Sequence, residues 1–138
     1  MTDIETLRCY CLSLPYVTED MAFGEECLLF RVFGKIFACY GFERNDYFVV
    51  KCNPDYAVEL RDRFSEITPA WHWNKRYWNQ ISMSGNLSAD FIFSLIRHSY
   101  SEVVGKLPRR VRQQYPELEE IRIANCYIES GVVNVDKK

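Results

Sequence analysis

The sequence predicts an α+β fold, a two-layer α/β sandwich in which helices cover one face of an antiparallel sheet. Three segments carry apolar residues at helical spacing behind a suitable N-terminal cap. Between them lie short runs rich in β-branched and aromatic residues that end at turn residues. The expected order is one helix, three strands, a second helix, one or two strands and a third helix.

The first helix is expected over residues 3–14, where apolar side chains recur at the spacing of a single buried stripe. Thr2 or Asp3 caps its N-terminus, and Pro15 ends it. The chain then becomes extended, with a short strand or an irregular edge at residues 18–23.

Two alternating runs flank a hairpin turn at Gly34, which is free to adopt positive φ. A third β-rich run, from Tyr47 to Cys52, completes an antiparallel meander of three strands. One face of this sheet is expected to pack on helices, and the other to be partly solvated.

Asn53 and Pro54 start the second helix, Asn53 as the cap and Pro54 at the first helical position. This helix is expected to end near Arg63. The segment 69–79 follows as a loop, and its end merges with a strand over residues 77–83.

Ser88 caps a long third helix that ends near Lys106. Its helical spacing places His98 away from the buried stripe and close to Glu102. The segment 109–120 is charged and polar and has no expected element of its own.

The chain has 138 residues, which favours a single domain, expected over residues 1–110. Residues 111–138 are expected to form a C-terminal extension that packs on the domain or trails from it, with a last strand or a packed tail at 121–128. A net charge of −2 argues against a surface that is basic all over. Any contact with nucleic acid therefore needs a local basic patch.

Six cysteines are present, but no C-x-x-C pair, so most are expected to pack as small apolar side chains. The sequence shows neither the pattern of a signal peptide nor a run of eighteen apolar residues. A reduced, cytoplasmic protein without a membrane partner is expected.

Motifs that carry enzymatic chemistry are missing from the sequence, including glycine-rich phosphate loops and a G-x-S-x-G elbow. His72 and His98 are the only histidines, which excludes most histidine-based metal sites. The acidic residues between Glu19 and Glu26 are best interpreted as a solvated loop. We therefore expect a protein that is not an enzyme, with no catalytic residue, cofactor or metal.

All three tryptophans lie in the segment 69–79. In an extended loop Trp71 and Trp73 would point to one side and His72 to the other. Trp78 should lie on the opposite sheet face from its strand neighbours and help to anchor the core. One candidate ligand site consists of five residues of this segment: Trp71, His72, Asn74, Trp78 and Asn79.

Basic side chains near aromatic rings form the other candidate site, because cations beside rings suit contact with phosphate and base. The simpler interpretation is that their aliphatic stems cover the rings while the charges stay in water. The basic residues in question are Arg31, Lys35, Lys51, Lys75, Arg76 and Lys106.

Several motifs follow one another in a characteristic order over residues 3–110: Leu14-Pro15-Tyr16-Val17-Thr18-Glu19-Asp20, Phe30-Arg31-Val32-Phe33-Gly34-Lys35-Ile36-Phe37-Ala38, Lys51-Cys52-Asn53-Pro54, the residues His72, Asn74, Lys75, Trp78 and Asn79, and His98-Ser99-Tyr100. In this order and spacing the chain resembles the MmcQ/YjbR family of small bacterial proteins. It departs from the family pattern at Asn53, Ala70, Trp71, Trp73 and Arg97.

The resemblance implies a two-layer α/β sandwich described as CyaY-like or secretion-chaperone-like, and a double-wing motif for binding DNA. For this chain it implies a DNA-binding face in which five cations converge: Arg31, Lys35, Lys51, Lys75 and Arg76. The alternative is a domain that binds a small ligand or a protein through segment 69–79. A monomer or a weak dimer is expected.

Overall fold

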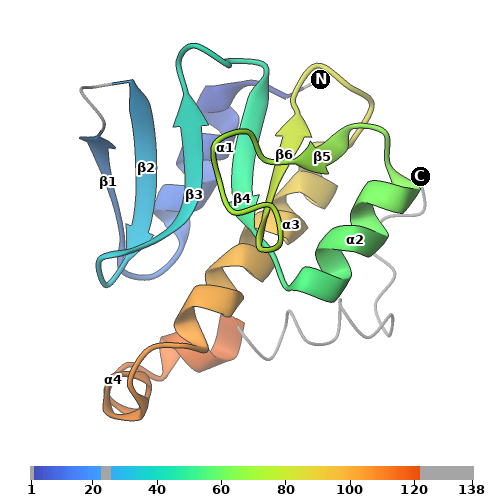
Figure 1. Cartoon of the computed structure of the whole chain (residues 1–138). Coiled ribbons are helices and arrows are strands. Elements are labelled where there is room, and N and C mark those ends of the chain that lie inside the picture. The colour runs from blue at the N-terminus through green and yellow to red at the C-terminus, as the bar shows by residue number, and fades with distance from the viewer. Residues whose placement is uncertain (1, 23–25, 122–138) are drawn as a thin grey trace.

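The computed structural model describes residues 2–22 and 26–121 of the chain. It contains a six-stranded antiparallel sheet whose strands run in the order β1-β2-β3-β4-β6-β5 (Figure 1). The elements are α1 (Ile4–Ser13), β1 (Val17–Ala22), β2 (Cys27–Val32), β3 (Lys35–Gly41), β4 (Tyr47–Lys51), α2 (Pro54–Arg63), β5 (Ile67–Pro69), β6 (Trp78–Ser82), α3 (Ala89–Val104) and α4 (Arg109–Gln114). The predicted α+β class is confirmed.

The meander has four strands, one more than the sequence predicted. β1 pairs with β2 from Val17 opposite Val32 to Ala22 opposite Cys27, so of the two alternatives, a short strand or an irregular edge, the strand is the one observed. The predicted strand over residues 18–23 extends to Phe23, which lies outside the described residues. After α2 the chain returns to the sheet at the edge opposite β1, where β6 pairs with both β4 and the short β5.

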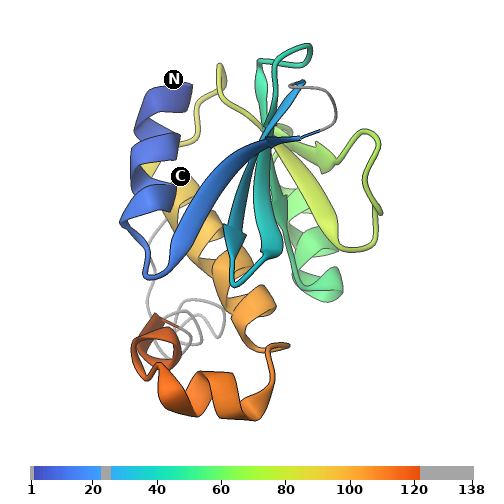
Figure 2. The same cartoon turned by 90° about the vertical axis from the view of Figure 1, so that its left-hand side faces the viewer.

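Helices cover one face of this sheet. α3 packs against β2, β3 and β4, and α1 lies beside it against β1. Figure 2 shows α1 and α3 on one side of the sheet and the connection between β5 and β6 on the other side. The main core between these layers contains large, fully buried side chains, among them Phe30, Phe37, Phe48 and Tyr100. Burial of this apolar area supplies most of the driving force for folding.

Local signals place the three main helices. Asp3, Asn53 and Ser88 each accept hydrogen bonds from backbone N–H groups of the first helical turn, as expected of N-caps. Pro54 occupies the start of α2, where its missing N–H costs nothing. These caps confirm the helix starts that the sequence predicted.

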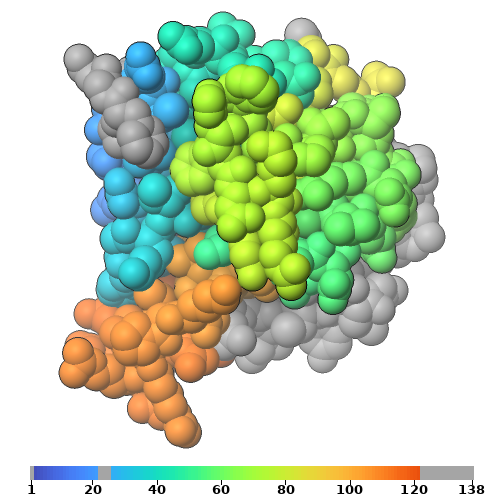
Figure 3. All heavy atoms as spheres, viewed as in Figure 1, coloured from blue at the N-terminus to red at the C-terminus, as the bar shows by residue number. Residues whose placement is uncertain are grey.

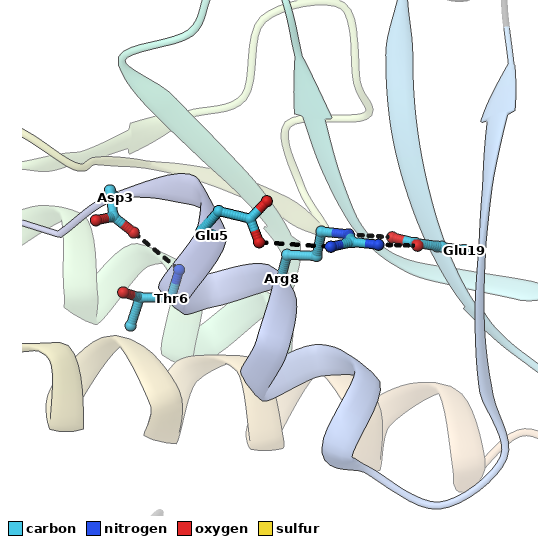
Figure 4. A network of polar contacts seen from close by, with 5 residues as sticks. All are labelled: Asp3, Glu5, Thr6, Arg8 and Glu19. Carbon is cyan, nitrogen blue, oxygen red and sulfur yellow. Dashed lines mark hydrogen bonds and ion pairs between the residues drawn. The ribbon is translucent and has the colours of Figure 1, made fainter.

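An ion pair joins α1 to the edge of the sheet. Arg8 donates to both carboxylate oxygens of Glu19 on β1, at 2.8 and 2.6 Å, and also contacts Glu5 on its own helix (Figure 4). Hydrogen bonds from Arg8 hold the pKa of the Glu19 carboxyl below its usual value. This bidentate contact fixes the position of α1 over β1.

His98 does not point towards solvent beside Glu102, as its helical spacing suggested. Its side chain is only 2% exposed, and its Nε2 accepts the backbone N–H of Asn53 at 3.0 Å. The ring also packs edge-on against Tyr56 of α2. The expectation failed because α3 is buried around most of its circumference, so its polar side chains also face protein.

Residues after 108 add structure that the sequence did not indicate. The basic run forms α4, and residues 117–121 are helical up to the last described position. Leu118 is fully buried in the main core, and Tyr115 packs on Phe33 and Tyr16. Of the strand or tail expected at 121–128, Ile121 is helical and the remainder lies outside the described residues, as does Cys126.

No helix within residues 2–22 and 26–121 combines the length and the apolar character needed to cross a membrane.

Candidate binding face

The face of the sheet opposite the helices has a small apolar cluster of its own. It consists of Leu29, Cys39, Val49, Ala70 and Trp78, with the partly buried Trp73 and Tyr77 packed against it. A loop, residues 70–77, covers this cluster in place of a helix. In Figure 3 this loop, drawn in lime green, crosses the middle of the face, with the orange end of α3 at its lower end.

Turns hold the loop in shape. The N–H of Tyr77 donates to the carbonyl of Asn74, and the Asn74 side chain accepts the N–H of Arg76 at 3.0 Å. His72 has a backbone φ of +69°, a conformation that residues other than glycine adopt uncommonly. The loop is therefore compact rather than extended, and Asn74 serves its turn.

Arg61 on α2 anchors the loop from behind. Its Nε donates to Oδ1 of Asn79 at 2.6 Å, and its terminal nitrogen donates to the carbonyls of Lys75 and Trp78. The Asn79 amide in turn donates to the carbonyl of Ala57 at 3.4 Å. Asn79 is 1% exposed and faces α2, so it lies on the opposite side of the sheet from the loop.

The tryptophans do not pair as an extended loop would require. Trp73 packs at a tilt of 40° against Trp78, with ring centroids 4.4 Å apart, while Trp71 packs edge-on against His72 and is 52% exposed. Trp71 and Trp73 border the same surface cleft, but His72 borders it too, so His72 does not lie on the opposite side as it would in an extended loop. Trp78 does anchor the open face, and Gln80 lies on the same side of the strand, as the alternation predicted.

A cleft of about 210 Å³ opens between the loop and the β3–β4 hairpin. Trp71, His72 and Trp73 form its loop side, and Arg44 and Tyr47 come from the hairpin. The Arg44 guanidinium lies 5.1 Å from the ring centre of Trp71 and 5.3 Å from that of Tyr47. We call this hollow the aromatic cleft.

Cys27 and Cys39 line the base of the aromatic cleft, beside Val49 and Gln80. Burial and the adjacent Cys27 thiol raise the pKa of the Cys39 thiol well above its usual value. Cys39 is therefore a protonated, unreactive thiol at neutral pH.

A second hollow, of about 340 Å³, lies where Lys35, Lys51 and Lys106 converge. Its apolar lining comes from Ile36, Val103 and Leu107. Lys51 stands opposite Trp78 on the neighbouring strand, and its Nζ lies 6.0 Å from the centre of that ring. We call this hollow the lysine hollow.

The lysines influence one another. Burial lowers the pKa of Lys51, and the positive charges of Lys106 and Lys35 lower it further, while Glu102 and Tyr77 act in the opposite direction. Among the described residues, no ion pair within 4.0 Å involves any of the three lysines. The hollow therefore concentrates positive charge that the fold does not neutralise by direct contact.

The five cations predicted to converge do so only in part. Lys35 and Lys51 meet in the lysine hollow. Arg76 is not among its lining residues, but it lies 5.7 Å from the centre of the Tyr77 ring, which Lys106 of the hollow approaches to 5.5 Å. Arg31 is held by Asp20 at 2.8 Å and by the Gly34 carbonyl.

Lys75 occupies the exposed outer part of the loop, and its backbone carbonyl accepts a hydrogen bond from Arg61. Of the five predicted ligand-site residues, Trp71 and His72 line the aromatic cleft, and Asn74, Trp78 and Asn79 are not among its lining residues.

Sequence reasoning did not single out Arg44 or Arg61, and it left Lys106 out of the five cations expected to converge. Lys106 was one of the six basic candidates but lies 55 positions after Lys51 in the chain, so only the fold reveals their proximity. Arg44 lies in the turn between β3 and β4, and nothing in the local sequence indicates its contact with Trp71. Arg61 looks like an ordinary surface residue of an amphipathic helix, and no local signal marks its contact with the loop.

The described residues contain no group of three or more histidine, cysteine, aspartate or glutamate side chains that could hold a metal ion. His98, buried among backbone and ring contacts, has a structural role in the junction between α3 and α2.

Sequence comparison finds relatives of the whole domain. A family model for YjbR matches residues 12–102. The protein YjbR of Escherichia coli K12 is 29% identical over 119 residues, which cover 86% of this chain and 100% of that protein. YbdF of Escherichia coli O157:H7 is 30% identical over 107 residues, 77% of this chain and 88% of that protein.

Solved structures agree with the fold. The crystal structure of Deinococcus radiodurans protein DR2400 matches with a TM-score of 0.75 at 28% identity, covering 83% of this chain and 88% of that one. A crystal structure of a protein from Pseudomonas syringae matches with a TM-score of 0.60 at 23% identity, over 71% of this chain and 96% of that one, and supports the fold alone. With residues 12–102 matched by the family model, the chain belongs to the YjbR family.

Proposed function

We propose that this domain is a non-catalytic binding protein whose ligand is nucleic acid, DNA in the first instance, held on the face of the sheet that the helices leave open. The observation that carries the proposal is the convergence of Lys35, Lys51 and Lys106 in one hollow. Nucleic acids present closely spaced phosphates, and lysine ammonium groups are common phosphate ligands.

The energetics of the lysine hollow favour an anion. Like charges gathered over an apolar lining repel one another, and the pKa of Lys51 is lowered first by burial and then by this repulsion. A phosphate between the ammonium groups would relieve the repulsion and displace counterions, and this displacement is the main source of affinity for a polyanion.

Further cations follow in the loop and in the chain after Lys106. Arg76 approaches the same Tyr77 ring as Lys106, and the exposed Arg109 and Arg110 follow a short distance along the chain. The net charge of the whole chain is −2, so the remaining surface is not expected to attract DNA. A site of this size predicts weak, salt-sensitive binding.

Fluorescence anisotropy with a labelled 20-base-pair duplex tests the proposal across a series of salt concentrations. Three phosphate contacts predict a slope of about −2.7 in a plot of log affinity against log salt. Changing Lys35, Lys51 and Lys106 together to glutamine should remove most of the binding at low salt and flatten the slope. Arg63→Gln is the matched control, because Arg63 is an exposed cation of α2 outside the hollow and pairs with Glu59.

Two results would contradict the proposal. One is the absence of any anisotropy change at low salt for the unmodified protein. The other is binding that the triple lysine variant retains while its circular dichroism spectrum matches that of the unmodified protein.

A small-ligand or protein-binding role remains the second candidate, supported by the aromatic cleft with its half-exposed Trp71. Clefts lined by rings and a few polar groups are common sites for small molecules. Titration calorimetry against a panel of aromatic metabolites tests this role. Heat of binding that Trp71→Ala abolishes would support it, and a panel without any heat change would count against it.

A further inference from the structure

We infer that the aromatic cleft receives an unpaired base, so that the domain prefers single-stranded nucleic acid to duplex. This inference rests on the proposed function and adds to it the strand type and a second contact. The occupant of the cleft is a base of the nucleic acid, and not a phosphate or a free metabolite.

The first argument is the exposure of Trp71. Tryptophan has a large apolar ring and usually anchors a core or a contact surface, yet Trp71 is 52% exposed at the mouth of the cleft. A base has a flat π surface that stacks on such a ring whatever its identity. In a duplex the bases are already stacked and paired, so an unpaired base can make this contact at lower cost.

The second argument is the charge of the cleft. Arg44 lies against the rings of Trp71 and Tyr47, and Glu26 and Glu43 also line the aromatic cleft. Two carboxylates beside one guanidinium make the cleft unfavourable for phosphate. They suit a neutral base, since carboxylates accept hydrogen bonds from amino groups on base edges and arginine donates to base oxygens and ring nitrogens.

The third argument is the closeness of the two hollows. Trp73 lines the aromatic cleft and its ring packs at a tilt against that of Trp78, with centroids 4.4 Å apart. The Nζ of Lys51 in the lysine hollow lies 6.0 Å from the centre of the Trp78 ring. Two successive contacts therefore connect a wall of the cleft with the cations. A single strand can place its backbone on the lysines and turn a base across the Trp73/Trp78 pair into the cleft.

Arg61 keeps this arrangement fixed. It donates hydrogen bonds to the carbonyls of Lys75 and Trp78 and to Oδ1 of Asn79, so the loop that separates the two hollows is attached to α2. A site held in place before binding loses less entropy when a strand binds.

The test compares one labelled 20-nucleotide strand with the duplex that it forms with its complement, at the same low salt. The unmodified protein should bind the strand about tenfold more tightly than the duplex, the size expected of one base stacked on an aromatic ring. Trp71→Ala should remove this preference and leave duplex affinity within about twofold. Phe42→Ala is the matched control, because Phe42 is an exposed ring that packs on Tyr40 and is not part of the cleft lining.

The outcomes separate the inference from the proposed function. Equal affinity for strand and duplex, or a Trp71→Ala variant that weakens both alike, would overturn the inference and leave DNA binding intact. A protein that binds neither probe at low salt would overturn both. Lys51→Gln should weaken strand and duplex to a similar extent, because its contact is to phosphate.

Discussion

The two faces of the sheet are covered in different ways. On one face, α1 and α3 bury a core of large rings and aliphatic side chains, including Phe30, Phe37 and Phe48. On the other face, the loop 70–77 closes a smaller buried cluster of five residues and leaves two hollows beside it. The helical face supplies the stability of the fold, and the open face, with fewer packing constraints, is where exposed rings and unneutralised cations are tolerated.

The largest expected effect compares two neighbours on β4 that point to opposite faces. Phe48→Ala removes a fully buried ring from the main core and should lower the free energy of unfolding by about 3–5 kcal/mol. Val49→Ala, under the loop, should cost about 1 kcal/mol, because less apolar area is lost and the loop has room to adjust. Urea denaturation followed by circular dichroism measures both. Equal losses would show that the faces contribute alike, against this account.

A smaller effect is expected from the link between the faces. Arg61→Lys keeps the charge but loses the planar fork that reaches Asn79 and two carbonyls, so unfolding free energy should fall by about 1–2 kcal/mol. Quenching of tryptophan emission by acrylamide should increase as the loop loosens. Arg63→Lys, two residues along the same helix, serves as the control and should change neither quantity. If Arg61→Lys quenches like the unmodified protein, another contact fixes the loop.

The smallest effect concerns the edge of the helical face. The pKa of Glu19 is lowered in the folded protein by hydrogen bonds from Arg8, so the pair stabilises the fold above the unfolded pKa of that carboxyl. The contribution disappears as pH falls through the lowered folded pKa. Glu19→Gln should therefore reduce Tm slightly at pH 7, and the difference from the unmodified protein should shrink as the solution is acidified below pH 4. A difference in Tm that stays constant with pH would rule out the ion pair as its source.

Short-range signals explain what the sequence predicted well. The caps Asp3, Asn53 and Ser88 act within one helical turn, so each can be recognised from its neighbours alone. The alternation that places Trp78 and Gln80 on the same side of β6 is equally local.

Features that depend on distant parts of the chain were missed. β5 has three residues and exists through its pairing with β6, which its own composition does not reveal. His98 was expected outside because helical spacing cannot show that α2 covers that side of α3. The helix α4 occurs in a stretch whose charges concealed Val111, one of the residues packed on the core.

The candidate site shows the same difference between local features, which the sequence reveals, and long-range contacts, which it does not. Segment 69–79 could be singled out from the sequence, because its unusual composition is a local property. The meeting of Lys35, Lys51 and Lys106 depends on a hairpin, a strand and a helix end, and the turn at His72 depends on tertiary contacts of the loop. Sequence alone could name the cations and the rings but not select which of them lie together.

Chemical-shift mapping tests the central claim most directly, because it reports both faces in a single titration. A ¹⁵N-labelled sample of the full chain is titrated at low salt with an unlabelled 20-nucleotide strand. The account predicts shifts for the backbone amides of Lys35, Lys51 and Lys106 and for the indole N–H of Trp71, while amides of α1 stay unchanged. Shifts concentrated on α1 and the outer surface of α3, or no shifts at all, would contradict the assignment of binding to the open face.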